Sequence, residues 1–288
     1  MLKITAFFLI GISILILGWF LSLVFSGQLI LPQTFNLGPL IVHYYGIVIA
    51  LAVMSAYMLA RYRAPRFGFT SVDLDRVALW VVAFGFIGAR VYHVITDYQL
   101  YMDSPISALY VWNGGLAIYG AVIGGFIGLY SALGSSYRFG VALAWLTPSI
   151  LVGQVIGRFG NFFNYELFGY PTALPWKMFV PEAFRSLAFR DISFFHPLFL
   201  YESLGIFLIL ILLLALERRQ VFNKEHASDL LISYILVNNA LRFLLEFLRI
   251  DSVLWAGTRF NAYVSLALAL LSLVAIFYLY VRKNSQYN

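Results

Sequence analysis

The sequence lacks cysteine altogether and contains few charged residues and few histidines. Without cysteine, the chain has no disulfide, no thiolate nucleophile of its own and no cysteine metal site. The histidines are scattered without metal-ligand spacing, so we predict no metal; they are His43, His93, His196 and His226. Charged residues make up 11% of the chain, against about a quarter in an average soluble domain, which excludes an ordinary soluble enzyme.

Apolar residues dominate the chain and occur in runs long enough to cross a bilayer. They are 62% of the 288 residues, and the alternation typical of a transmembrane β-barrel is absent. Since a span needs about 20 apolar residues, we predict an all-α integral membrane protein. It would form a single polytopic membrane domain, 1–288, with about eight transmembrane helices. The runs lie near 4–26, 40–60, 76–96, 108–132, 141–163, 197–216, 229–248 and 261–281.

The first run, within 1–26, has two interpretations. Lys3 in front of it is typical of the positive region of a signal peptide. However, the run is longer than the roughly 7–15 residues of a signal-peptide core, and no small-residue cleavage site follows it. We therefore predict an uncleaved N-terminal helix.

Positive residues alternate between successive loops. They precede the first run and follow the second, fourth, sixth and eighth, whereas the loops 27–39 and 97–107 have none. The positive-inside rule then places both termini in the cytoplasm. The net charge of +6 thus reflects membrane orientation, and we predict no nucleic-acid partner. With this orientation, we predict that the long connection 164–196, between the fifth and sixth helices, forms a small head on the outer face. Five positive residues fall outside the pattern: Lys177, Arg185, Arg190, Arg249 and Arg259.

Polar residues gather in the predicted outer halves of six runs, while the inner halves are nearly apolar. Such residues at membrane depth are costly and usually functional. They include His43, Tyr45, Arg90, Tyr119, Arg158, Asn161, Asn164, His196, Tyr201, Glu202, Arg242, Glu246 and Arg249. A guanidinium group stays charged and matches the geometry of a phosphate. Two arginines with one glutamate leave the positive charge that an anionic lipid headgroup needs, so we predict such a site facing the outer leaflet.

Simpler structural interpretations stay open beside this one. Arg242–Glu246 and Arg158–Glu166 would be ion pairs that hold helices together. His196, before Pro197, would be a loop or cap residue, and Tyr45, Tyr92 and Tyr201 would be interfacial aromatics. The glycines that recur every fourth residue at Gly120, Gly124 and Gly128 favour small-residue helix packing.

From about Leu37 to about Val281, the chain resembles the bacterial prolipoprotein diacylglyceryl transferase family. Its most specific stretch is Gly157-Arg158-Phe-Gly160-Asn161-Phe-Phe-Asn164-Tyr-Glu166-Leu-Phe-Gly169, which matches the family pattern G-R-x-G-N-F-x-N-x-E-x-x-G. Accessory matches follow in order: His43-Tyr-Tyr45-Gly46, Gly88-Ala-Arg90, Trp112-Asn-Gly114-Gly115-Leu, Gly120, His196-Pro197 with Tyr201-Glu202, and Arg242-Phe-Leu-Leu-Glu246-Phe-Leu-Arg249.

The resemblance implies an enzyme of the bacterial cytoplasmic (inner) membrane. It would transfer the diacylglyceryl group of phosphatidylglycerol to the thiol of the lipobox cysteine in a prolipoprotein signal peptide, releasing glycerol-1-phosphate without a cofactor. The motif positions imply that one side of the lipid-binding and catalytic site is formed by Arg158, Asn161, Asn164, Glu166 and Gly169. The second side of the site would be formed by Arg242, Glu246 and Arg249. The resemblance also implies a functional tyrosine at Tyr45 and supporting residues at His43, Arg90, His196, Tyr201 and Glu202.

The chain departs from the family at three points. Many members have a histidine, proposed to help activate the thiol, where this chain has Tyr119. Ala144 stands where some members have an aspartate. The first helix is additional to the usual family core of seven.

As a mechanism, we expect Arg158 and Arg242 to grip the phosphate, Glu246 to orient Arg242, and Asn161 to hydrogen-bond the lipid. Tyr119 or His196 would assist the thiol. Two other functions stay open: an anion transporter, which predicts inverted repeats and polar groups through the midplane, and a non-catalytic lipid-binding membrane scaffold.

Overall fold

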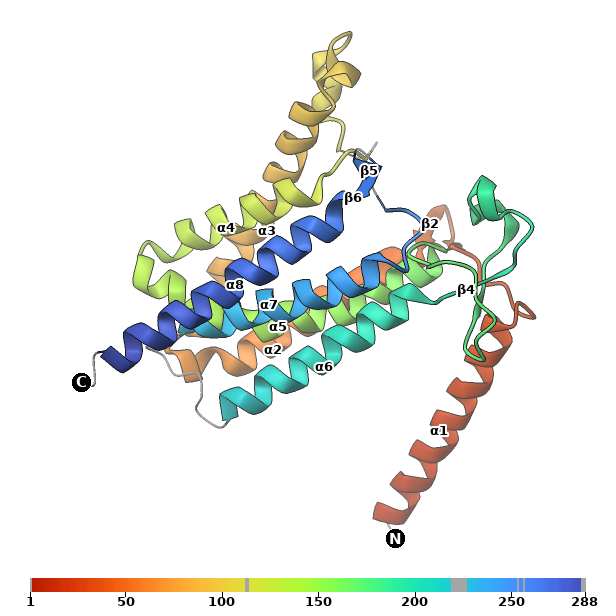
Figure 1. Cartoon of the computed structure of the whole chain (residues 1–288), viewed down its shortest axis with the longest axis horizontal. Helices are drawn as coiled ribbons and strands as arrows, with labels where there is room; N and C mark the ends of the chain where they lie inside the picture. The colour runs from red at the N-terminus through yellow and green to blue at the C-terminus, as the bar shows by residue number, and fades with distance from the viewer. Residues whose placement is uncertain (1, 112–113, 219–226, 253, 256, 286–288) are drawn as a thin grey trace. The chain divides into compact units, whose positions relative to one another are not determined.

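The computed structural model describes the chain except residues 1, 112–113, 219–226, 253, 256 and 286–288. Trp112 and Asn113 of the family pattern therefore lie outside the described residues. The described part forms eight α-helices, one at each predicted apolar run (Figure 1). They are α1 Leu2–Phe25, α2 Tyr44–Arg63, α3 Ser71–Thr96, α4 Ile118–Leu133, α5 Ser136–Phe163, α6 Leu198–Arg218, α7 Ala227–Glu246 and α8 Phe260–Ser285.

The largest boundary difference concerns α4, which begins at Ile118 although the apolar run begins near 108. The 3-10 helix η3 (Pro105–Leu109) occupies the start of that run. Gly114 and Gly115 then adopt left-handed backbone angles, with φ of 85° and 77°. Right-handed helix cannot continue through such residues, so the apolar stretch divides into a loop and a shorter helix.

Short strands and 3-10 helices connect the α-helices. The hairpin of β1 (Thr34–Leu37) and β2 (Leu40–His43) precedes α2, and Thr34 pairs with His43. In 164–196, β3 (Met178–Phe179) pairs with β4 (Phe194–Phe195). Before α8, β5 (Leu254–Trp255) pairs with β6 (Thr258–Arg259). The remaining 3-10 helices are η1 Ala64–Phe67, η2 Tyr98–Tyr101, η5 Glu182–Phe184 and η6 Leu187–Phe189.

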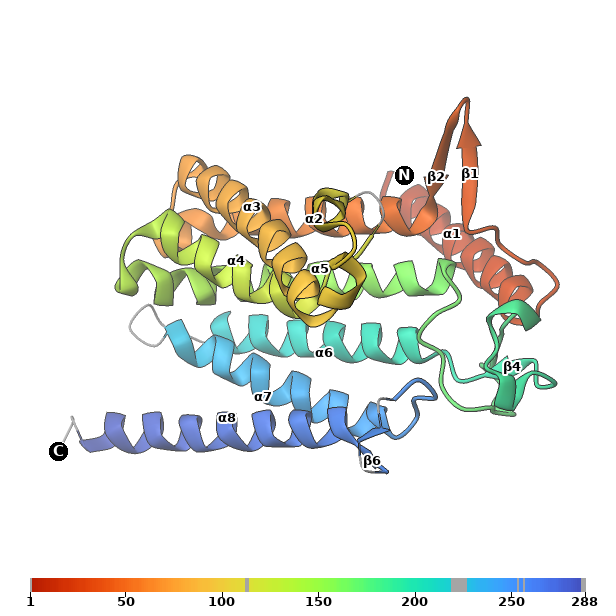
Figure 2. The same cartoon turned by 90° about the horizontal axis from the view of Figure 1, so that it is seen from above.

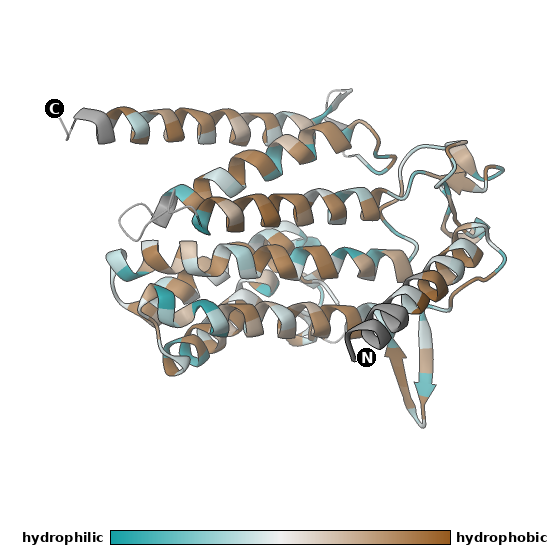
Figure 3. Cartoon of the chain, turned by 90° about the horizontal axis from the view of Figure 1, so that it is seen from below, coloured by the Kyte–Doolittle hydropathy of each residue, from teal (hydrophilic) through white to brown (hydrophobic). Residues whose placement is uncertain are grey.

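Five of the described helical segments are long and apolar enough to cross a membrane. They are Tyr44–Phe67, Ser71–Thr96, Ser136–Phe163, Leu198–Arg218 and Phe260–Val281. The described parts of α1 and α4 are apolar but shorter, and α7 carries Asp229, Arg242 and Glu246 along its length. Hydrophobic residues cover the helices over most of their length (Figure 3). The chain is thus a helical membrane protein, and the count of eight spans stays a prediction.

The chain divides into two compact units, and each is described by itself. Unit 1 comprises Met1–Met54, Leu151–Leu214 and Ile232–Asn288. Unit 2 comprises Ser55–Ile150 and Ala215–Leu231.

In unit 1, tight contacts join neighbouring helices, whose ribbons run as a row in Figure 2. The Ser203 hydroxyl of α6 donates to the Val155 carbonyl of α5 at 2.9 Å. Gly205 of α6 lies against Leu241 of α7. A buried cluster then fixes the end of α1 and the segment after α5 to the start of α6: Val24, Phe162, Leu167, Met178, Val180, Phe195, Leu198 and Phe199.

In unit 2, α3 and α4 pack so closely that glycine is required where they meet. A Cβ atom on Gly120 would collide with the carbonyl oxygen of Gly88, and one on Gly124 with the carbonyl oxygen of Phe84. A Cβ on Gly128 would collide with the carbonyl oxygen of Trp80. Helix packing through small residues is therefore confirmed for this glycine repeat.

Unit 2 also contains a buried ion pair that the sequence did not indicate. Arg63 Nη1, at the end of α2, lies 2.6 Å from Glu217 Oε2, near the end of α6, and the side chains are 5% and 3% exposed. Arg63 also donates to the carbonyl groups of Trp145 and Ala144. Arg63 was predicted only as one of the positive residues that follow the second run, so its pairing with Glu217 is a finding of the structure.

Replacing Glu217 with alanine is expected to destabilise the fold strongly, because the Arg63 guanidinium would stay buried without its counter-charge. Breaking such a pair from one side costs about 3–5 kcal/mol. Thermal unfolding of the purified protein in detergent would measure the loss. The control is Glu182→Ala, which removes an ion pair with Arg190 whose side chains are 61% and 63% exposed. Equal unfolding temperatures for the two variants would contradict the prediction.

Candidate functional site

The turn that follows α5 orients the polar residues of the signature. The Glu166 amide donates to the Asn161 carbonyl at 2.9 Å. The side-chain amides of Asn161 and Asn164 both donate to the Glu166 carboxylate, at 3.2 and 3.3 Å. Glu166 therefore pairs with two asparagines, and the alternative interpretation of Arg158–Glu166 as an ion pair is wrong, because the two side chains form no ion pair in the described structure.

This turn holds two residues in a strained backbone conformation. Tyr165 and Leu167 have φ of 54° and 56°, a left-handed region that costs side-chain-bearing residues about 1–2 kcal/mol each. Packing compensates for the strain, because Leu167 is buried in the unit 1 cluster and the Tyr165 hydroxyl donates to the Leu31 carbonyl at 2.7 Å. Strain retained in this way is typical of functional sites.

Gly160 and Gly169 allow two close approaches that shape the site. The ring of Tyr45 rests on Gly160, where an added Cβ would lie 2.8 Å from Tyr45 Cδ2. At Gly169, an added Cβ would lie 2.6 Å from the Leu248 carbonyl oxygen and 3.0 Å from His196 Cβ. Gly157 has more room, with its nearest neighbour, Ile49 Cδ1, at 3.8 Å.

Backbone hydrogen bonds around Gly169 join three distant stretches of the chain. The Gly169 amide donates to the His196 carbonyl at 2.9 Å, and the His196 amide donates to the Tyr170 carbonyl at 3.1 Å. The Tyr170 amide donates to the Leu248 carbonyl at 2.9 Å. The signature, the start of α6 and the end of α7 thus meet through their main chains.

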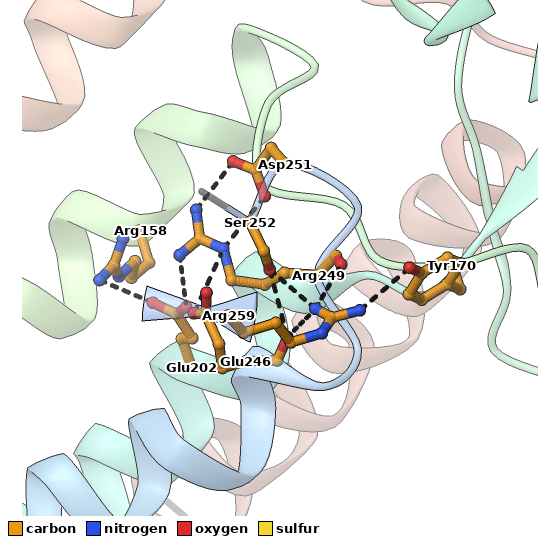
Figure 4. Close-up of polar contacts among 8 residues, drawn as sticks. All are labelled: Arg158, Tyr170, Glu202, Glu246, Arg249, Asp251, Ser252 and Arg259. Atoms are coloured by element: carbon orange, nitrogen blue, oxygen red, sulfur yellow. Dashed lines mark hydrogen bonds and ion pairs between the residues drawn. The ribbon is translucent and has the colours of Figure 1, made fainter. Parts of the chain in front are cut away.

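Arginines and carboxylates from these three stretches form a connected network (Figure 4). Arg158 Nη2 lies 2.6 Å from Glu202 Oε2, and Glu202 Oε1 lies 3.8 Å from Arg249 Nη1. Arg249 in turn donates to both carboxylate oxygens of Asp251, at 3.0 and 2.8 Å. Arg158 therefore pairs with Glu202 and Arg249 with Asp251. The sequence pattern had named neither acid as the partner of these arginines.

Arg259 is a member of the network that the sequence prediction left out. Its Nη1 donates to the carbonyl groups of Glu246 and Arg249, at 2.6 and 3.1 Å, and to the Ser252 hydroxyl at 2.8 Å. Its Nη2 donates to the Tyr170 hydroxyl at 3.0 Å. The available signal was its positive charge on the predicted outer side, which the charge rule did not explain.

Arg242 and Glu246 lie one turn apart on α7 without pairing with each other. Arg242 is half-buried and forms no hydrogen bond or ion pair with any other described residue. Its positive charge nevertheless acts on Arg158, as does that of Arg249. The carboxylate of Glu246 is 3.9 Å from Arg249 Nε. The alternative interpretation of Arg242–Glu246 as an ion pair is thus wrong. The prediction that Glu246 orients Arg242 finds no support either, because the two side chains form no hydrogen bond or ion pair with each other in the described structure.

His196 takes part in a chain of three hydrogen-bonding side chains. Trp176 Nε1 donates to the Tyr201 hydroxyl at 2.7 Å, and that hydroxyl lies 3.0 Å from His196 Nδ1. Burial lowers the pKa of His196 below its ordinary value, so the neutral ring is favoured. The Tyr201 hydroxyl can then donate to Nδ1, which leaves the proton on Nε2.

The other predicted site residues have different surroundings. His43 is an exposed residue at the end of β2. Tyr119, in unit 2, is 64% exposed, and its ring centroid lies 6.1 Å from that of Tyr92. Arg90, also in unit 2, donates to four backbone carbonyls at 2.7–2.9 Å, those of Ser107, Ala108, Gly114 and Gly115.

Arg90→Lys is expected to loosen the loop before α4, because one ammonium group cannot reach four carbonyls that a guanidinium fork spans. Amide hydrogen exchange in residues 107–111 and 114–117 should accelerate at least about tenfold, equivalent to ~1.4 kcal/mol. The control is Arg76→Lys, the same change at an exposed position of α3. Unchanged exchange in the loop of the Arg90 variant would show that the four hydrogen bonds are dispensable.

The arrangement in unit 1 suits an anion. Arginines outnumber acids in the network once Arg242 is included, and Arg242 has no acidic partner among the described residues. No group of three or more potential metal ligands occurs in the described part of the chain. An incompletely neutralised pair of guanidinium groups near an apolar environment favours a phosphate or another oxyanion.

Comparison with known proteins gives a consistent family assignment. The sequence model of the family Prolipoprotein diacylglyceryl transferase matches residues 32–278. The chain is 39% identical over 279 residues to the phosphatidylglycerol--prolipoprotein diacylglyceryl transferase of Thermotoga maritima, covering 94% of both chains. Proteins with the same name from Fervidobacterium nodosum and Acaryochloris marina are 38% and 35% identical, over 92% and 88% of this chain and 90% and 92% of their own.

Proposed function

The chain belongs to the prolipoprotein diacylglyceryl transferase family, and on that premise we propose that it performs the first step of lipoprotein maturation. It transfers the diacylglyceryl group of phosphatidylglycerol to the thiol of the lipobox cysteine in a prolipoprotein signal peptide. The observation that carries this proposal is the arginine network of unit 1, in which Arg158 lies 2.6 Å from Glu202 while the neighbouring charge of Arg242 has no acidic partner among the described residues. This excess of positive charge in an apolar bundle needs an anion, and the donor lipid supplies one.

In the reaction, sulfur attacks the glyceryl carbon that carries the phosphate ester. A carbon–sulfur bond forms, the carbon–oxygen bond breaks, and the electron pair leaves on glycerol-1-phosphate. Arg158 and Arg242 stabilise the charge that develops on the departing phosphate. Asn161 and Asn164, oriented by Glu166, hold the lipid, while Tyr45 and Gly169 shape its binding site.

The nucleophile is the thiolate of the substrate cysteine. An unperturbed cysteine has a pKa near 8.5, and positive surroundings increase its thiolate fraction. A neutral His196 whose Nδ1 accepts from Tyr201 is a positioning residue in this scheme. Tyr119 or His196 is auxiliary in this scheme, and the arginines supply the main electrostatic effect.

The finer membrane arrangement belongs to the same proposal. Eight helices span the cytoplasmic (inner) membrane of a bacterium as a single polytopic domain, with both termini in the cytoplasm. The signature and the segment 164–196 face the outside, so that the enzyme reaches lipid of the outer leaflet and exported precursors. Its partners are phosphatidylglycerol, lipobox-containing prolipoproteins and membrane lipid; nucleic acid and cofactors have no role.

The test is transfer of a radiolabelled diacylglyceryl group from phosphatidylglycerol to a synthetic lipobox peptide by the purified protein. The expected product is a thioether that carries the label, absent when serine replaces the cysteine of the peptide. Lipid binding without thioether formation would instead support the non-catalytic scaffold, and movement of a labelled anion across proteoliposomes would support a transporter.

A further inference from the structure

Glu246 carries one of the two buried carboxylates of unit 1 that have an oxygen without a hydrogen-bond partner among the described residues; the other is Glu202. Glu246 is 3% exposed, and its Oε1 is fully buried without a hydrogen-bond partner among the described residues. The nearest opposite charge, Arg249 Nε, is 3.9 Å from Oε2, and that nitrogen already donates to Asp251. Burying a carboxylate without a hydrogen bond is unfavourable, so this position lacks a donor.

The backbone of the same residue is held firmly. The Glu246 carbonyl accepts from Arg259 Nη1 at 2.6 Å and from the Arg249 amide at 3.2 Å. Its main chain is therefore fixed to the network, while its carboxylate receives no hydrogen bond from the part of the chain that the structure describes. Glu202, the other buried acid here, differs because its Oε2 lies 2.6 Å from Arg158 Nη2 and is charge-compensated.

Arg242 supplies the second unpaired group, one helical turn earlier on the same face of α7. Side chains at this spacing lie about 5–6 Å apart at their Cβ atoms. A guanidinium without an acidic partner among the described residues, next to a carboxylate whose only charge contact there is the 3.9 Å one with Arg249, calls for a ligand that is anionic at one end and donates hydrogen bonds at the other. A headgroup that joins a phosphate to hydroxyl groups through a short carbon chain has this chemistry.

We infer that the orphaned Glu246 carboxylate accepts a hydrogen bond from a hydroxyl of the glycerol headgroup of the donor lipid, while Arg242 binds its phosphate. This inference rests on the proposed function and assigns to Glu246 the selection of a hydroxylated headgroup. The headgroup stays on the phosphate when the carbon–oxygen bond breaks, so Glu246 holds the leaving group and takes no part in proton transfer.

The test compares two donors of equal charge, phosphatidylglycerol and phosphatidylpropanol, whose headgroup has three carbons but no hydroxyl. Their leaving groups are both alkyl phosphates, so the chemical step is closely matched. The wild-type protein is expected to favour phosphatidylglycerol in kcat/KM by about 10–100-fold, the range for losing a hydrogen bond to a charged group. Glu246→Leu should reduce this preference below about threefold, and Glu246→Gln, which keeps an acceptor, should retain part of it.

Glu202→Gln is the matched control, since it alters the other buried acid and should slow both donors alike while leaving the preference intact. Equal use of the two donors by the wild-type protein would overturn the inference, whether or not the variants fold. An unchanged preference in Glu246→Leu would overturn it as well. Failure of the proposed function is distinct, because the wild-type protein would then form no thioether from either donor.

Discussion

Arg242→Ala is expected to lower kcat/KM for diacylglyceryl transfer by about 10²–10³-fold, the usual cost of removing one donor that stabilises developing charge. The same variant should fold at least as stably as the wild-type protein, because Arg242 has no ion pair or hydrogen bond among the described residues to lose. Its removal also relieves the repulsion of Arg158. Transfer to a lipobox peptide and thermal unfolding in detergent would measure the two effects separately.

Arg158→Ala provides the informative contrast. Activity should fall by a similar factor, but stability should fall as well, because Glu202 loses the partner at 2.6 Å and stays buried. Arg190→Ala, a change at an arginine that is 63% exposed, should alter neither property. Transfer activity near that of the wild-type protein in either Arg158→Ala or Arg242→Ala would refute the proposal that both arginines bind the lipid phosphate.

Gly169→Ala is expected to reduce transfer by about 10²-fold, the loss typical of a misplacement of about 1 Å at a catalytic site. The added Cβ would lie 2.6 Å from the Leu248 carbonyl oxygen, so the end of α7 would have to move away from the signature. That movement would displace Arg249, which follows Leu248 directly. Transfer to the lipobox peptide measures the loss, and circular dichroism checks that the helices remain.

Gly157→Ala is the matched control within the same signature. Its added Cβ would lie 3.8 Å from Ile49 Cδ1, an ordinary contact, and alanine also favours the helix by roughly 1 kcal/mol relative to glycine. Activity close to wild type is therefore expected. If both glycine variants lost activity equally, crowding against Leu248 would not be the cause.

The sequence indicated which residues of α7 share a face, because helical periodicity is local. Arg242 and Glu246 lie one turn apart on α7 as their spacing predicts, whereas Arg249, predicted on the same helix face, lies beyond the end of α7 at Glu246. The electrostatic interaction of Arg158 with Arg242 and Arg249 still agrees with a common location. The helices themselves were also predictable, since apolar runs of this length have few other stable structures. The exception was the late start of α4, which follows from the left-handed backbone angles of Gly114 and Gly115. The apolar pattern of the run does not contain this information.

The local sequence pattern could not predict which acidic residue each buried arginine would pair with. Arg158 binds Glu202, 44 residues away along the chain, and not Glu166, because the separation of two charges depends on which helices pack together. Arg63 and Glu217 are separated by 154 residues, and nothing in either sequence neighbourhood marks them as a pair. Arg90 was predicted as a supporting residue of the site. Its hydrogen bonds to four backbone carbonyls could not be predicted, because they depend on the path of the loop before α4.

Three backbone hydrogen bonds join Gly169, His196, Tyr170 and Leu248. This kind of junction has an evolutionary consequence. Peptide groups recognise one another whatever side chains they carry, so this junction tolerates amino-acid replacement at Leu248 far better than a junction built from side chains would. Gly169 is constrained by size, and Tyr170 by the hydroxyl that accepts from Arg259. The arginine framework can therefore keep its dimensions while much of the surrounding sequence drifts.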